Sequence, residues 1–438
     1  MTRIATEIHG PRPFDQPLER ADLDIDDKKR VNLLAWRGQF SPQFVQAILE
    51  SYTQQNDVIL DPFVGSGTVL VESAHLGHDV YGFEVNPAAE ILAKIYTFTG
   101  YSPKERRTLL SRTEKILSEY IPLGLPLFDS SILSDDNSVS ITPLIRDLSG
   151  LKCVDSKILI ESLIVKLDLD GEHFPIHSLW SKWNALRTLV ESLPRSQKTV
   201  SVALGDARYL PLDDAVIDFV LTSPPYINVF NYHNNYRTSI ELLGWNPLVS
   251  AKSEIGANRK FRQNRFLTVV QYCIDMSLSL AELVRVCRSS GRIIFVVGRE
   301  SNVHKTAFFN GAILRRLAEE IIGIKTALQQ ARQFQNKFGN LIKEDILHFI
   351  PDNGQQINRS LTIEQAKQIG ADVLSSARDR VPTDRHGILD DALSHAHKIE
   401  PSPEFIAAYA KESKANWFSS ETALCHLFGT TEIPRRVR

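Results

Sequence analysis

The residues best suited to chemistry form a short run, Thr222-Ser223-Pro224-Pro225-Tyr226, that follows an apolar stretch at residues 216–221. The apolar stretch predicts a buried strand, so the run is the loop at its end. Two consecutive prolines remove two backbone donors and fix two φ angles, which predicts a rigid turn with free carbonyl acceptors. Such a turn can hold a flat molecule with an amino group, because the ring stacks on its face and the oxygens accept from its NH₂. A strand-end turn whose tyrosine only packs on the core is the alternative.

A second motif, Asp61-Pro62-Phe63-Val64-Gly65-Ser66-Gly67-Thr68, follows a short apolar run at residues 58–60. Residues 69–76 then show a helical pattern, and Gly77 is the expected C-cap. The glycines allow a ligand to approach the backbone, and the start of the helix offers free N–H groups. The motif therefore predicts the phosphate- or nucleoside-binding turn of a βαβ unit, with a purely structural turn as the alternative.

The next predicted strand, residues 80–84, ends on an acid, Glu84. An acid at this distance from a glycine loop is placed to accept hydrogen bonds from ribose hydroxyls. The third glycine of the dinucleotide fingerprint is absent, since Thr68 begins a Thr-Val-Leu-Val run instead. That difference weighs against NAD or FAD as the ligand.

Length and composition set the class of protein. The chain has 438 residues, enough for two to three domains of typical size. Its 43% hydrophobic and 23% charged shares are ordinary for a soluble globular protein. No apolar run approaches the roughly 20 residues of a membrane span, and the first residues lack the apolar core of a signal peptide. We expect no membrane segment.

Charge and cysteine content add two expectations. The formal net charge of −2 gives no global basic field, so nucleic-acid binding would have to come from local patches. The four cysteines form neither a CxxC pair nor a disulfide framework, and no His/Cys cluster predicts a metal. We therefore expect a cytoplasmic protein without a metal site. The cysteines are Cys153, Cys273, Cys287 and Cys425.

Alternating strand and helix patterns continue after residue 199 and predict an α/β fold with a mostly parallel, twisted sheet and helices on both faces. One strand ends at Asp206. Residues 269–287 predict an amphipathic helix with one apolar face. Residues 324–328 and 342–350 are the expected final strand pair.

Three segments interrupt this alternation. Residues 1–30 are rich in charge and proline and predict an irregular arm. Residues 101–198 predict a largely helical insertion whose first helix is basic, most simply as a solvated face. Residues 351–438 predict a helical C-terminal extension. The α/β domain is then divided between residues 31–100 and 199–350.

The loop after Tyr226, residues 227–265, interleaves amide, aromatic and basic side chains, which is what contact with nucleic acid requires. A polar surface loop is the alternative. The residues concerned are Asn228, Phe230, Asn231, Tyr232, His233, Asn234, Asn235, Tyr236, Arg237, Lys252, Arg259, Lys260, Arg262 and Arg265.

With both motifs present, the chain resembles the amino-methyltransferases that modify exocyclic nitrogens of DNA bases, over residues 31–100 and 199–350. Residues 61–68 look like the S-adenosylmethionine loop of that family, and Phe40-Ser41-Pro42 resembles its cofactor motif before the first strand. Residues 222–226 look like its catalytic motif in the serine-first form associated with cytosine-N4 methylation. Adenine-N6 members usually carry Asp or Asn at the serine position.

The resemblance implies a Rossmann-like methyltransferase fold, S-adenosylmethionine as cofactor and no metal. It implies double-stranded DNA as substrate, with the target base flipped out of the helix. Whether a partner restriction endonuclease accompanies the protein in a restriction-modification system stays open. The implied cofactor contacts are Phe40, Ser41, Asp61, Phe63, Gly65, Gly67 and Thr68, with Glu84 on the ribose and Asp206 facing the adenine. The implied catalytic residues, which hold the target base, are Ser223, Pro224, Pro225 and Tyr226.

Other functions stay open at this point. The guanine-N2 methyltransferases of RNA share the cofactor loop but usually show Asp-Pro-Pro-Tyr and an N-terminal RNA-binding domain. A catalytically silent DNA-binding subunit on the same fold is a non-enzymatic alternative. Carbon-5 methylation would need a cysteine nucleophile, and none lies near either motif. Residues 101–198, 227–265 and 351–438 are all candidates for the segment that recognises the DNA sequence.

Overall fold

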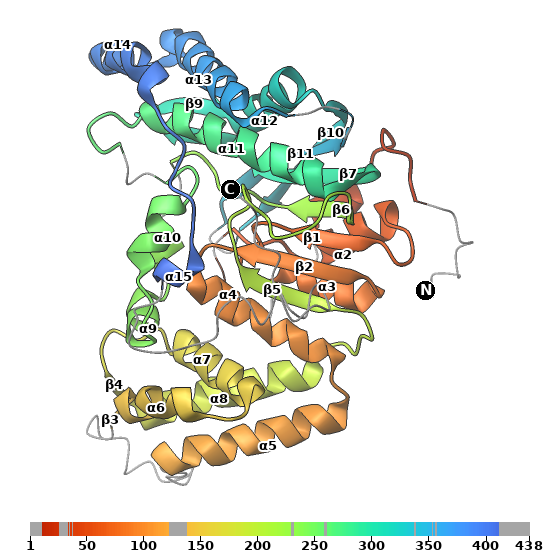
Figure 1. Cartoon of the computed structure of the whole chain (residues 1–438), viewed down its shortest axis with the longest axis vertical. Helices are drawn as coiled ribbons and strands as arrows, with labels where there is room; N and C mark the ends of the chain where they lie inside the picture. Colours follow the sequence, from red (N-terminus) through yellow and green to blue (C-terminus); the bar gives the residue numbers. More distant parts are fainter. Residues whose placement is uncertain are drawn as a thin grey trace.

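The structure is a computed structural model with a central sheet, helices on both of its faces and a helical layer at one end (Figure 1). It describes residues 11–25, 34, 36, 38–121, 138–228, 232–257, 261–336, 339–352, 354 and 357–410. Several of the expectations above concern residues outside these ranges: the start of the N-terminal arm, residues 122–137 of the insertion, Phe230, Asn231, Arg259, Lys260, Cys425 and the tail from 411 to 438.

Seven strands form the central sheet in the order β10-β11-β7-β6-β1-β2-β5. Strands β5, β2, β1, β6 and β7 are parallel, whereas β11 runs antiparallel to both β7 and β10. The α/β fold with a mostly parallel sheet is confirmed, as is the final strand pair. The strands are β1 (Val58–Asp61), β2 (Asp79–Glu84), β5 (Val200–Leu204), β6 (Ile217–Thr222), β7 (Cys287–Gly298), β10 (Lys325–Gln335) and β11 (Leu341–Ile350).

The strand order reverses next to β1, and this position determines where a ligand can bind. Going along the chain, β2 and β5 lie on one side of β1, while β6 and β7 lie on the other. Ligands of open parallel sheets bind beyond the carboxyl ends of the strands at such a switch point. The ends of β1, β2 and β6 carry Asp61, Glu84 and Ser223, so the topology brings both motifs to one edge.

Both faces of the sheet are covered because the strand side chains alternate between two apolar cores. Ile59 of β1 and Phe219 of β6 belong to one core, and Leu60 and Val220 belong to the other. The first core includes α2 (Pro42–Tyr52), α3 (Thr68–Leu76) and α4 (Pro87–Ala93). The second includes α11 (Leu267–Val286), α12 (Asn310–Arg316) and α13 (Arg359–Ser376).

Helix α11 differs from the one-faced amphipathic helix expected from its sequence. Sixteen of its twenty residues are buried, because α13 covers the side that faces away from the sheet. The two helices approach closely at Gly370, where an added Cβ would lie 2.8 Å from Val270 Cα. The helix is long and apolar enough to cross a membrane, which corrects the expectation about apolar runs, but 83% of its apolar window is buried inside the protein.

The described part of the insertion, residues 101–121 and 138–198, forms a mainly helical layer beside α4 (Figure 1). Arg106 departs from the solvated basic face that its helix predicts. It is 1% exposed, and its guanidinium donates to the carbonyls of Phe98, Thr99, Leu193 and Pro194. Arg106 therefore ties the two ends of the insertion together. The layer contains α5 (Pro103–Tyr120), α6 (Thr142–Asp147), α7 (Val154–Leu167), α8 (Ile176–Ser192), β3 (Ser138–Ser140) and β4 (His173–Pro175).

The C-terminal segment returns to the side of the molecule that carries α10. After α13 and α14 (His386–His395), the chain runs along the second core down to α15 (Ala407–Ala410), drawn in blue beside α10 (Pro247–Ser253) in Figure 1. The Asn246 N–H donates to the Ala410 carbonyl (2.7 Å). The remaining elements are α1 (Arg20–Asp24), α9 (Arg237–Leu242), β8 (Glu300–Val303) and β9 (Thr306–Phe309).

Candidate active site

A cavity of about 930 Å³, including the part open to solvent, lies beyond the carboxyl ends of β1, β2 and β6. Both sequence motifs contribute to its wall. Of the residues predicted as site residues, those that line it are Phe40, Asp61, Phe63, Gly65, Thr68, Glu84, Asp206, Ser223, Pro225 and Tyr226.

Three predicted site residues do not line the cavity. Ser41 is the N-cap residue of α2, and Pro224 is buried. Gly67 has a left-handed φ of +90°, and a Cβ there would lie 2.7 Å from the ring of Tyr96. Gly67 is therefore required for packing of the loop against the segment after α4, and it is Gly65 that faces the cavity.

The glycine loop is held by a hydrogen bond to the side chain of Glu84 at the end of β2. Gly65 has a φ of +51°, and its N–H donates to Glu84 Oε2 (3.0 Å). An added Cβ would lie 3.1 Å from the indole of Trp36. These constraints leave a bare backbone surface on the wall of the cavity, as a closely approaching ligand requires.

Glu84 is fixed at the end of β2 by three backbone donors. Besides Gly65, the N–H groups of Val85 and Asn86 donate to Glu84 Oε1, each at 3.0 Å. Burial raises the pKa of this carboxyl to about 7. The expected ribose contact would add a further hydrogen bond to Glu84, which already accepts one from the glycine loop.

Asp61 couples the two motifs directly. The Thr222 hydroxyl donates to Asp61 Oδ1 (2.6 Å), which also accepts from the Phe63 N–H (3.1 Å). This bond forms because β1 and β6 are parallel neighbours whose ends lie level. Burial raises the pKa of Asp61 to about 7, so the link joins the glycine loop to the Ser-Pro-Pro-Tyr turn through a carboxyl that titrates near neutrality.

Replacing Asp61 by asparagine should change the pH dependence of stability. The pKa of Asp61 is higher in the folded protein than in the unfolded chain, so the folded state holds the proton at intermediate pH. Stability of the wild type is therefore lost as pH rises towards 7, whereas the side-chain amide of the variant cannot titrate. Urea unfolding at pH 5 and pH 8 should show Asp61→Asn gaining stability relative to the wild type as pH rises, by on the order of a few kcal/mol.

The exposed aspartate Asp384 provides the control for this experiment. Asp384→Asn should follow the wild-type pH curve, because its carboxylate is 72% exposed beside Arg385. Parallel curves for Asp61→Asn and wild type would mean that Asp61 does not hold its proton in the folded protein.

The Ser-Pro-Pro-Tyr turn contributes Ser223, Pro225 and Tyr226 to the wall of the cavity. Ser223 Oγ lies 3.4 Å from the hydroxyl of Tyr226. The Tyr226 ring packs against the end of β7, where a Cβ on Gly298 would lie 3.0 Å from it. Burial raises the pKa of Tyr226, so the phenol stays neutral. A hydroxyl and a neutral ring thus stand side by side on one wall.

An aromatic wall that sequence reasoning missed stands near the glycine loop. Trp36 stacks against Tyr232 (centroids 6.4 Å apart) and Tyr236 (6.2 Å). Both Trp36 and Tyr232 line the cavity. The sequence signal for this wall is that Tyr232 belongs to residues 227–265, for which the sequence predicts contact with nucleic acid. Tyr232, His233 and Tyr236 instead face inward, which leaves fewer side chains of residues 227–265 for DNA.

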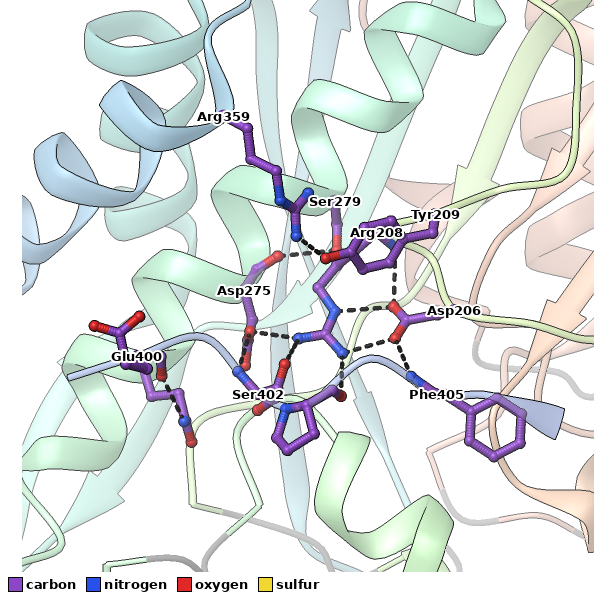
Figure 2. A network of polar contacts seen from close by, with 11 residues as sticks. Asp206, Arg208, Tyr209, Asp275, Ser279, Arg359, Glu400, Ser402 and Phe405 are labelled. Carbon is purple, nitrogen blue, oxygen red and sulfur yellow. Dashed lines mark hydrogen bonds and ion pairs between the residues drawn. The ribbon is translucent and has the colours of Figure 1, made fainter. Parts of the chain in front are cut away.

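Asp206 borders the cavity but is bonded within the protein (Figure 2). Its Oδ1 accepts from the backbone N–H and Nε of Arg208, and its Oδ2 accepts from Arg208 Nη2 (2.7 Å) and the Phe405 N–H (3.0 Å). An adenine contact by this carboxylate would have to be shared with these donors.

Arg208 also fastens the C-terminal segment to α11. Its Nη1 donates to Asp275 Oδ1 and to the Ser402 carbonyl, each at 2.7 Å, and Nη2 donates to the Pro403 carbonyl (2.9 Å). The Ser402 N–H donates to the same oxygen of Asp275 (2.8 Å). Figure 2 shows these bonds converging on one guanidinium. Residues 402–405 therefore support the cavity wall from behind.

Comparison with known proteins agrees with this geometry. The family described as DNA methylase, with the model name N6_N4_Mtase, matches residues 21–94, which include α2, the glycine loop and Glu84. Over these residues the chain is similar to this family of DNA methylases, which covers both N4 and N6 enzymes. S-adenosylmethionine is the methyl donor of the family.

Two curated relatives are named Type II methyltransferases. M.MjaII of Methanocaldococcus jannaschii is 35% identical over 60 residues, which are 14% of this chain and 11% of the relative. M.BsoBI of Geobacillus stearothermophilus is 24% identical over 268 residues, 49% of this chain and 52% of the relative. The chain thus spans about a tenth and about half of the lengths of these relatives.

Solved structures show a weaker likeness. A SAM-dependent methyltransferase from Methanosarcina mazei has a TM-score of 0.31 at 12% identity, covering 69% of this chain and 95% of that chain. The rRNA methyltransferase aviRa from Streptomyces viridochromogenes has a TM-score of 0.29 at 12% identity, covering 82% and 99%. At such scores the likeness adds nothing to the assignment, which depends on the family match and the sheet order.

Proposed function

We propose that the protein transfers the methyl group of S-adenosylmethionine to the N4 amino group of cytosine in double-stranded DNA, at a specific sequence. The observation that carries the proposal is Ser223, a hydroxyl at the end of β6 that lines the same cavity as the glycine loop. The Thr222–Asp61 bond fixes the serine relative to that loop. The family match and the Type II names of the two relatives support DNA as substrate.

The cavity fits the cofactor on the side of the glycine loop. The bare backbone at Gly65, the helix start at Thr68 and the acid Glu84 would hold its methionine and ribose parts. Phe40 and Phe63 add apolar wall. When bound there, S-adenosylmethionine supplies an electrophilic methyl group.

The Ser-Pro-Pro-Tyr turn would then orient the acceptor nitrogen. The cytosine amino group is a poor nucleophile because its lone pair is delocalised into the ring. The Ser223 hydroxyl would accept an amino hydrogen and favour a pyramidal nitrogen, so most of the rate comes from positioning. This nitrogen is out of reach inside a duplex, so the base must flip out and stack on Tyr226.

Mass spectrometry of nucleosides is the direct test. DNA is incubated with the protein and labelled cofactor, then digested. Labelled 4-methylcytosine supports the proposal. Labelled 6-methyladenine without 4-methylcytosine would mean that the enzyme is a DNA methyltransferase whose target base is adenine. Label that enters only RNA would favour the guanine-N2 alternative, and cofactor binding without any transfer would favour a silent DNA-binding subunit.

Ser223→Ala should lower turnover while cofactor binding stays unchanged. The substitution removes an acceptor aligned on the reacting nitrogen, which costs roughly 1–3 kcal/mol of barrier, or about 5- to 150-fold in rate. Single-turnover kinetics and calorimetry separate the two effects. Ser394→Ala, at an exposed serine of α14, is the control and should react like wild type. Equal turnover in Ser223→Ala would exclude the hydroxyl as an acceptor for the amino group.

The same proposal includes the organisation of the chain. Residues 31–100 and 199–350 form the catalytic domain, and the helical layer of residues 101–198 beside α4 is our candidate for recognising the DNA sequence. A partner restriction endonuclease is consistent with the Type II names of the relatives. We also propose a cytoplasmic location.

A further inference from the structure

Glu254 is a second carboxylate in the cavity that neither sequence motif contains. It follows α10, and it lines the cavity together with Ser253 and Ile255. Only 5% of the residue is exposed. Its Oε2 lies 2.8 Å from Nδ1 of His233, which is itself 4% exposed.

The other oxygen of Glu254 has nothing to bond. Oε1 is buried and has no hydrogen-bond partner among the residues that the structure describes. An unmade hydrogen bond of a buried acceptor is costly, and more so for a charged group. A ligand that brings a donor or a positive charge into the cavity would remove this cost.

Glu254 lies close to the expected cofactor contacts. Burial is the main cause that raises the pKa of Glu84, and the negative charge of Glu254 raises it further. Both oxygens of Glu84 already accept backbone N–H groups. Of these two acids, Glu254 is therefore the one with an oxygen that no described residue bonds.

We propose that Glu254 is a cofactor-binding carboxylate, held by His233, whose charge favours cationic S-adenosylmethionine over the neutral thioether product. The inference rests on the proposed function and adds the residue that discriminates substrate from product. The two ligands differ by the methyl group and the sulfonium charge that it creates. A negative charge in a cavity of low dielectric constant distinguishes them even without direct contact.

Glu254→Gln tests the proposal, because it removes the charge and keeps the shape. Calorimetry with S-adenosylmethionine and, separately, with S-adenosylhomocysteine, both without DNA, measures the effect. We expect at least a 10-fold loss of affinity for the first ligand and a smaller loss for the second. Glu241→Gln is the matched control and should bind both ligands as wild type does, since Glu241 pairs with Arg237 on the surface.

Three results would overturn the inference. The first is an unchanged affinity of Glu254→Gln for both ligands, and the second is an equal loss of affinity for both. The third is unchanged cofactor binding with weakened DNA binding, which would mean that Glu254 contacts the target base. Glu254→Asp keeps the charge and should keep the preference for the cationic ligand, which tests the proposal even where the glutamine variant fails to fold. Wild-type protein that binds neither ligand would instead refute the proposed function.

Discussion

Gly65→Val is expected to abolish measurable cofactor binding, a loss of well over 10-fold. Valine would have to adopt a left-handed φ of +51°, which costs roughly 1–2 kcal/mol for a residue with a Cβ. Its Cβ would lie 3.1 Å from the Trp36 ring, and the branched methyl groups would occupy the cavity where the ligand must approach the backbone. Calorimetry with S-adenosylmethionine measures the loss.

Gly77→Val separates the strain of the backbone from the loss of ligand space. Gly77 has a φ of +80° at the end of α3, but a Cβ added there would meet no heavy atom within 4 Å. This variant should lose some stability and keep its cofactor affinity. If Gly65→Val folds and still binds the cofactor as wild type does, the glycine loop does not form the cofactor site.

The second large effect is expected at Arg208, where methionine should destabilise the fold by about 3–5 kcal/mol. The change leaves Asp206 and Asp275 buried without their cation, although they are only 4% and 0% exposed. It also removes the donors that hold the carbonyls of Ser402 and Pro403. Urea unfolding measures the loss, and cofactor affinity should fall because Asp206 borders the cavity.

Arg237→Met is the matched control for this network. Arg237 pairs with Glu241, and both side chains are 44% exposed. Exposed ion pairs contribute at most about 1 kcal/mol to stability. The free energy of unfolding of the control should therefore lie within about 1 kcal/mol of the wild-type value. A loss equally small for Arg208→Met would show that residues 402–405 are not fastened through the guanidinium.

The sequence by itself determined the βαβ unit around the glycine loop and the position of the Ser-Pro-Pro-Tyr turn. Both depend on local signals: an apolar run that ends at a polar residue, glycines in the turn, and a helical period that follows. The limits of β1, α3 and β2 agree with the prediction to within one residue. The carboxyl ends of parallel strands share an edge, but the bond between Thr222 and Asp61 also required β1 and β6 to be neighbours, which the structure decided.

What only the tertiary structure decided is the set of partners of buried polar side chains. From the sequence, Arg106 is predicted to be a surface charge on a solvated helix. Asp206 is predicted to be a carboxylate that contacts the cofactor. Their partners lie far away in the sequence, Leu193 and Pro194 for the first and Phe405 for the second. Glu254 carries no local pattern at all. Most of helix α11 became buried because α13 returned to cover the side that faces away from the sheet. Local periodicity reports which face of an element is apolar, whereas the partner of a charge depends on which distant segment the fold places beside it.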